Sequence, residues 1–122
     1  MYIYHIVAAI RVNSSRSLFL DRKLRRLLIY VRIGIMAMLD YYGKDGVLYQ
    51  EIKDAFKLSD GSLGPNLTWL KDNKYIEERD EEIEGHNVAV YYATDEGKLA
   101  YIQVKKWLDT LLHASDNSDK EV

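Results

Sequence analysis

Apolar side chains recur at three- and four-residue steps in several stretches of the chain, and this spacing predicts amphipathic helices. The first stretch covers residues 24–42, and a turn with glycines at 43 and 46 ends it. Residues 47–48 then predict a very short strand. Helical spacing returns over residues 48–56, and again over residues 63–70 in a third helix that ends near residue 72.

The periodicity changes to that of strands after residue 74. Residues 75–82 and 88–93 are strand-like runs, and the turn expected between them, at residues 85–87, predicts a hairpin. Thr94 is then suited to cap a last helix that ends near residue 113. The apolar stripe of this helix is wider than one contact with a small domain would cover, which suggests a partner helix.

Composition places the chain among globular proteins of one domain. Its 122 residues are 48% hydrophobic and 30% charged, with no cysteine. Disulfides, thiolate metal sites and cysteine nucleophiles are therefore excluded, and a cytoplasmic location is expected. The apolar start stops at Arg11, too soon for a membrane span, so neither a signal peptide nor a membrane anchor is expected.

Charge is distributed unevenly along the chain, although the net charge is only −2. Residues 1–32 hold seven basic side chains and one acidic one, whereas residues 60–100 hold four basic and ten acidic ones. The basic end indicates either a polyanionic partner or a solvated helix face, and both interpretations remain open.

Sites for catalysis, metals or cofactors are not expected. The histidines His5, His86 and His113 lie in three separate predicted elements without a metal-binding spacing. The sequence has no glycine-rich phosphate loop and no nucleophile elbow. Carboxylates in succession along a strand point to alternate faces, so the acidic run at residues 77–84 does not converge on a cation. The chain is therefore not expected to be an enzyme.

The order of the predicted elements is that of a winged helix, in which two helices joined by a tight turn precede a hairpin. Residues 60–67 read DGSLGPNL, residues 74–76 read KYI, and residues 91–97 read YYATDEG. On these motifs, residues 32–100 resemble the MarR/ArsR-type winged-helix regulators, particularly their small archaeal and bacterial branch.

This resemblance implies an α+β, mostly helical protein: a winged helix-turn-helix with a two-stranded wing and with N- and C-terminal dimerisation helices. The expected organisation is an N-terminal extension or helix at 1–30, a DNA-binding domain at 31–94, a dimerisation helix at 95–114 and a disordered tail at 115–122. The implied function is that of a homodimeric regulator that binds double-stranded DNA and represses by occlusion. The alternative is a winged-helix module that binds proteins and not DNA. With no cysteine, any effector is expected to be neither a thiol-reactive oxidant nor a thiolate-bound metal.

The third helix is expected to enter the major groove, held to the core by Leu63, Leu67 and Leu70. Because proline lacks an N–H, Pro65 is expected in the first turn of this helix, with Ser62 as its cap. Asn66 is expected to contact adenine, and Trp69 to be partly exposed beside the DNA. The candidate DNA-binding residues of this helix are Ser62, Gly64, Pro65, Asn66, Thr68, Trp69 and Lys71.

The wing and the basic N-terminal region supply the remaining candidates for DNA binding. The wing residues expected to contact the DNA backbone are Arg79, His86 and Asn87. The carboxylates of the first wing strand would repel phosphates. These charges are also explained as protection of a sheet edge against association with another sheet. Arg22, Arg25 and Arg26 are expected either to contact the DNA backbone beside the recognition helix or to form the solvated side of a dimerisation helix.

Overall fold

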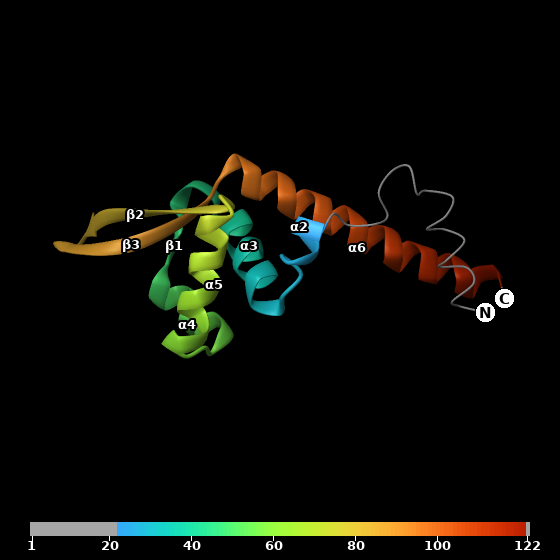
Figure 1. Cartoon of the computed structure of the whole chain (residues 1–122), viewed down its shortest axis with the longest axis horizontal. Coiled ribbons are helices and arrows are strands. Elements are labelled where there is room, and N and C mark those ends of the chain that lie inside the picture. The colour runs from blue at the N-terminus through green and yellow to red at the C-terminus, as the bar shows by residue number, and fades with distance from the viewer. Residues whose placement is uncertain (1–21, 122) are drawn as a thin grey trace. The chain divides into compact units, whose positions relative to one another are not determined.

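The chain folds into two compact units in a computed structural model that describes residues 22–121, with side chains described as far as residue 114. One unit is Leu27–Tyr101. The other holds residues 22–26 and 102–121 of the described chain. Residues 1–21, which make up most of the predicted N-terminal extension, lie outside the described residues (Figure 1).

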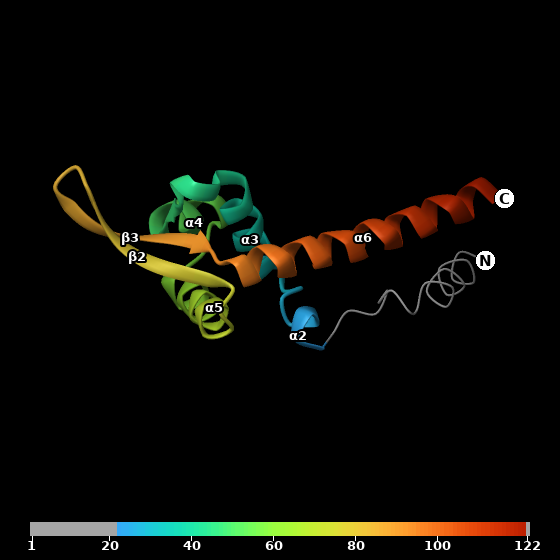
Figure 2. The same cartoon turned by 90° about the horizontal axis from the view of Figure 1, so that it is seen from above.

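The helices of the unit Leu27–Tyr101 follow the predicted order. They are α3 (Tyr30–Tyr42), the 3-10 helix η2 (Gly43–Asp45), α4 (Tyr49–Phe56) and α5 (Asp60–Asp72), with the short strand β1 (Val47–Leu48) preceding α4. The three α-helices lie beneath the sheet in Figure 1, and in Figure 2 α3 and α4 are seen on one side of the strands and α5 on the other.

The prediction of one helix over residues 24–42 is wrong. The structure has a short helix α2 (Arg22–Arg25), a turn, and then α3, whose N-cap Ile29 has the extended dihedrals φ −82° and ψ 131°. Leu27, in the turn, is fully buried. The apolar spacing continues through the turn because apolar residues of the turn are buried by tertiary packing. Spacing alone does not distinguish such a buried turn from a continuous helix.

The hairpin forms the outer part of a three-stranded antiparallel sheet of order β1-β3-β2, with β2 (Ile76–Ile83) and β3 (His86–Ala93). Its turn is centred on Glu84 and Gly85, with φ of 53° and 82°. The turn lies earlier than predicted, and His86 and Asn87 belong to β3. Two central residues with positive φ match the twist of the flanking strands, and this favours the two-residue turn.

The last helix, α6 (Asp95–Glu121), begins where predicted, since the Thr94 hydroxyl accepts a hydrogen bond of 2.9 Å from the backbone N–H of Gly97. It does not end near residue 113 as predicted, and it continues as far as Glu121, through most of the residues expected to form the tail. Adding a residue to an existing helix costs little, and no glycine or proline follows Gly97 to end it.

The core of the unit Leu27–Tyr101 lies between the helices and the inner strands. Buried apolar side chains come from α3, α4, α5, β1, β3 and the start of α6, and they include Ile35, Met36, Leu39, Ile52, Leu63, Leu70, Val47, Val90 and Ala100. The predicted α+β winged-helix class is confirmed. Among the described residues, no helix combines the length and hydrophobicity that a membrane span requires.

Candidate nucleic-acid interface

Helix α5 is the predicted recognition helix, and it begins earlier than expected. The Ser59 hydroxyl, and not that of Ser62, caps it by accepting a hydrogen bond of 3.2 Å from the backbone N–H of Ser62. Pro65 consequently lies inside the helix, where it removes one backbone hydrogen bond. Serine at position 59 is a strong N-cap in its own right, and the helix tolerates the missing bond beyond its first turn.

One side of α5 holds the helix to the core, as the leucine spacing predicts. Leu63, Leu67 and Leu70 are buried. On the opposite side Gly61, Pro65 and Thr68 are exposed, whereas the other candidates on this helix are half-buried: Ser62, Gly64, Asn66, Trp69 and Lys71. The exposed residues present a narrow helical surface with small side chains.

Asn66 is engaged within the protein by both ends of its amide. Its Oδ1 accepts a hydrogen bond of 3.0 Å from Nε of Arg32 on α3, and its Nδ2 donates one of 2.9 Å to the carbonyl oxygen of Ser62. A bidentate contact with adenine would use the same two groups. Reading a base through Asn66 would therefore require both internal bonds to break.

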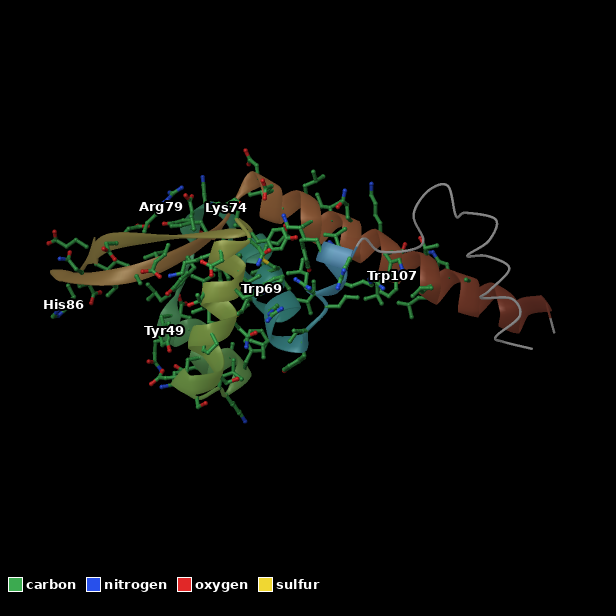
Figure 3. The ribbon with its side chains drawn as sticks, viewed as in Figure 1. Tyr49, Trp69, Lys74, Arg79, His86 and Trp107 are labelled. Atoms are coloured by element: carbon green, nitrogen blue, oxygen red, sulfur yellow. The ribbon has the colours of Figure 1, made fainter. Side chains whose placement is uncertain are left out.

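Trp69 lies on the side of α5 that faces α3, and Tyr49 lies on the opposite side (Figure 3). The guanidinium carbon of Arg32 is 3.9 Å from the centroid of the Trp69 ring, within the range of a cation–π contact. The same ring is 5.9 Å from that of Tyr75. Arg32 thus joins α3 to two residues of α5, and Trp69 is part of this packing.

Three polar side chains meet at the start of α5. Oδ1 of Asp60 accepts a hydrogen bond of 2.7 Å from the Tyr49 hydroxyl and lies 3.1 Å from Nζ of Lys53. The bond from Tyr49 and the ammonium of Lys53 lower the pKa of Asp60, while the same carboxylate raises the pKa of Tyr49. Tyr49 and Lys53 were not among the residues predicted from the sequence, although they lie one turn apart on the preceding helix.

Lys71, near the end of α5, forms a second lysine–carboxylate pair. Its Nζ donates to Glu78 of β2 at 3.0 Å. Hydrogen bonds from Tyr91 and from Lys71 lower the pKa of Glu78. Burial, followed by the bond to Glu78, raises the pKa of Tyr91 well above its ordinary value. The candidate cation Lys71 is therefore paired within the protein.

The wing is acidic and its one arginine is also engaged. Arg79 pairs with Glu77, and its guanidinium carbon lies 4.3 Å from the centroid of the Tyr92 ring. His86 and Asn87 are exposed, with His86 at the tip of the hairpin (Figure 3). Because strand side chains alternate, Glu78, Asp80 and Glu82 share one face of β2. Phosphates would be repelled along this face.

The basic N-terminal candidates belong to the other compact unit. Arg22 and Arg25 lie in α2 and Arg26 directly follows it, and all three are exposed. Within residues 22–114, no group of three or more histidine, aspartate or glutamate side chains is arranged to hold a metal ion.

Comparison with known proteins adds a family and several similar folds. Residues 31–112 match the family described as the winged helix DNA-binding domain. An uncharacterized protein of Methanocaldococcus jannaschii is 28% identical over 87 residues, which cover 71% of this chain and 89% of that protein.

Solved structures of transcriptional regulators share the fold at low sequence identity. The apo form of MarR from E. coli has a TM-score of 0.60 at 17% identity, covering 88% of this chain and 79% of that one. A transcriptional regulator homologue from Pyrococcus horikoshii OT3 has a TM-score of 0.60 at 23% identity, covering 81% and 91%. A PadR-like regulator from Bacillus cereus has a TM-score of 0.61 at 19% identity, covering 80% and 95%.

Proposed function

Because the chain belongs to the family of winged helix DNA-binding domains, we propose that it binds double-stranded DNA and regulates transcription. The observation that carries this proposal is the exposed side of α5. Three buried leucines fix the helix to the core, and Gly61, Pro65 and Thr68 remain open to solvent on its other side. An α-helix presented in this way fits the major groove.

In the proposed complex α5 enters the major groove and the wing lies toward the flanking DNA. Ser62 and Thr68 are the side chains suited to hydrogen bonds with phosphates or base edges. Neutralised phosphates supply much of the affinity of such complexes, and Lys71 and Arg79 are already paired with carboxylates. The exposed Arg22, Arg25 and Arg26 are proposed to add backbone contacts, because their part of the chain carries the excess of basic residues that residues 60–100 lack. Binding would repress by occlusion, in the cytoplasm and without a cofactor.

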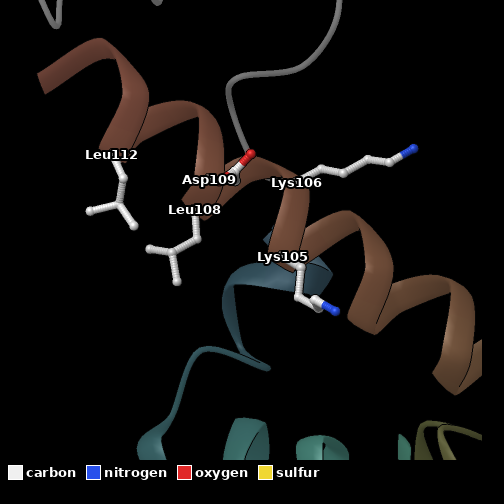
Figure 4. Close-up of a pocket in the computed structure, with 5 residues that line it drawn as sticks. All are labelled: Lys105, Lys106, Leu108, Asp109 and Leu112. Atoms are coloured by element: carbon white, nitrogen blue, oxygen red, sulfur yellow. The ribbon is translucent and has the colours of Figure 1, made fainter. Parts of the chain in front are cut away.

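We further propose that the regulator is a homodimer joined through α6. Leu108 and Leu112 lie one turn apart on this helix and are 47% and 58% exposed. They line a groove of about 380 Å³ together with polar side chains of the same helix, Lys105, Lys106 and Asp109 (Figure 4). A second copy of the helix would remove these leucines from water, and a twofold dimer is the commonest symmetric assembly.

A second candidate function is a protein-binding module of the same fold. It is favoured by the charges around α5, where Lys53, Lys71 and Arg79 are all paired with carboxylates. An acidic wing of this kind suits a basic protein surface better than a phosphate backbone.

Titration of a fluorescent mixed-sequence duplex, followed by anisotropy at roughly 50 and 200 mM salt, separates the two functions. The DNA-binding proposal expects saturable binding that weakens with salt and that is stronger for duplex than for the single strand of the same length. Absence of binding at low salt would reject DNA binding and favour the protein-binding module.

A further inference from the structure

In the cluster of Tyr49, Lys53 and Asp60, two donor side chains of α4 contact the same carboxylate oxygen of α5. Tyr49 and Lys53 lie one turn apart on α4, and both reach Oδ1 of Asp60, the first residue of α5. These are the two helices of the helix-turn-helix. Tyr49 lies on the side of α5 away from Trp69 and α3 (Figure 3).

The two donors match a phosphate oxygen as well as they match a carboxylate. A phosphodiester oxygen carries negative charge and accepts bonds from hydroxyl and ammonium groups, which are among the usual backbone contacts of DNA-binding proteins. The side chain of Asp60 is 71% exposed, whereas that of Lys53 is 30% exposed. The carboxylate thus occupies the solvent side of the cluster, where an incoming anion would have to bind.

An exposed ion pair of this type is readily exchanged. Surface salt bridges contribute little net stability because water and salt screen them and because two side chains must be held in place. A DNA backbone, with a phosphate at every nucleotide, presents a high local concentration of competing anions. Exchange of Asp60 for a phosphate would leave the two donors almost in place.

The pair of Lys71 and Glu78 is a useful contrast, because similar chemistry is held more firmly there. Glu78 lies directly opposite Tyr91 of the central strand β3, and its side chain is 33% exposed, whereas that of Asp60 is 71% exposed. The carboxylate of Glu78 is therefore less accessible to a competing anion. Of these two lysine–carboxylate pairs, the one at Asp60 is the exchangeable one.

We propose that Tyr49 and Lys53 form a binding site for a backbone phosphate of DNA, and that Asp60 occupies this site in the free protein. The proposal rests on the proposed function and deepens it. A phosphate must displace the carboxylate of Asp60, so this residue lowers affinity for every duplex regardless of sequence. The site acts as a built-in restraint on non-specific binding.

A double-mutant cycle tests the site with the full-length chain and a mixed-sequence duplex. The proteins compared are the wild type, Asp60→Asn, Lys53→Gln and the double variant, with anisotropy measured over a range of salt concentrations. Asp54→Asn is the matched control, because Asp54 is an exposed carboxylate on α4 that bonds to Gln50 and has no lysine partner in the described structure. Circular dichroism melting verifies that each variant is folded.

Asp60→Asn is expected to raise affinity several-fold, and Lys53→Gln to weaken binding and reduce the salt slope by about 0.9. Most of the gain from Asp60→Asn should vanish in the double variant, and Asp54→Asn should give little gain. An equal gain with and without Lys53, or an unchanged salt slope in Lys53→Gln, would overturn the phosphate site while leaving DNA binding intact. Failure of all five proteins to bind would overturn both proposals.

Discussion

The carbonyl oxygen of Tyr75 occupies the space beside Gly97 in which any other residue would place its Cβ. A Cβ on Gly97 would lie 1.9 Å from this oxygen, far inside van der Waals contact. The same oxygen accepts a hydrogen bond of 3.1 Å from the backbone N–H of Thr94. The first turn of α6 is thereby fixed directly against the residue that precedes β2.

Gly97→Ala is therefore expected to destabilise the protein, by about 1–3 kcal/mol or more, because backbone must move to admit the methyl group. Urea denaturation followed by circular dichroism measures the loss as a lower midpoint. Gly64→Ala is the control, since a Cβ at Gly64 would have no atom within 4 Å. It should gain up to about 1 kcal/mol from helix propensity. Equal stability of the two variants would contradict the close contact.

Arg32→Lys should loosen the packing of α3 against α5 although it keeps the charge. Lysine has no planar guanidinium to lie over Trp69 while donating to Asn66, and the absence of these interactions is expected to cost on the order of 1 kcal/mol. Trp69 fluorescence, recorded in a Trp107→Phe background, should change in intensity or wavelength. Arg25→Lys, at an exposed position, is the matched control and should alter neither property.

Contacts between residues close in the sequence could be predicted, and contacts between distant ones could not. The buried face of α5 follows from the spacing of Leu63, Leu67 and Leu70, and the start of α6 follows from Thr94 as a cap. The link from Arg32 to Asn66 spans 34 residues. It depends on how two helices pack, which the period of either helix does not specify.

The same limit explains why the electrostatics of the interface were only partly predictable. An excess of acidic residues in 60–100 was visible in the sequence, but the pairing of Lys53 with Asp60 depends on the turn between α4 and α5. Asn66 was expected to point at DNA because it lies off the leucine stripe. The leucine stripe identifies the buried side of α5, but it does not show which of the two neighbouring sides of the helix packs against α3.

Stability is expected to fall in alkaline solution through Tyr91. Its pKa is raised above the ordinary value of 10.0 by burial and by the bond to Glu78. The unfolded chain therefore loses the phenolic proton first, so this contribution to stability is fully present below pH 10 and is lost as pH rises toward the folded value. Urea midpoints on both sides of pH 10 measure the loss, which should be smaller in Tyr91→Phe. If the urea midpoint of Tyr91→Phe depended on pH in the same way as that of the wild type, Tyr91 would not be the source of the alkaline loss of stability.

Removal of the three exposed arginines near α2 should weaken binding to all duplexes alike. The variant Arg22→Ala, Arg25→Ala, Arg26→Ala is expected to reduce the salt slope by about 0.9 for each phosphate that is no longer neutralised, without changing the preference among sequences. Anisotropy titrations over a range of salt concentrations measure both quantities. Unchanged affinity and slope would mean that these arginines form a solvated surface, and the protein-binding alternative would gain support.

The proposed dimer predicts that charges on one face of α6 will separate the subunits. Leu108→Asp combined with Leu112→Asp would place two carboxylates in an apolar contact, where burial without partners is costly. Light scattering after size exclusion should show a dimer for the wild type and a monomer for this variant. Gln103→Asp, at an exposed polar position of the same helix, is the control and should remain dimeric.

Point substitutions test the dimer more sharply than removal of α6 would. The start of this helix belongs to the core of the unit Leu27–Tyr101, since Ala100 is buried and Gly97 contacts Tyr75. A chain stopped after Thr94 would lose that packing, and a monomer or an aggregate could then result from unfolding alone. Leu108 and Leu112 are exposed in the single chain, so their replacement should leave its melting unchanged when the protein is too dilute to associate. A folded variant that still dimerises would place the subunit contact elsewhere.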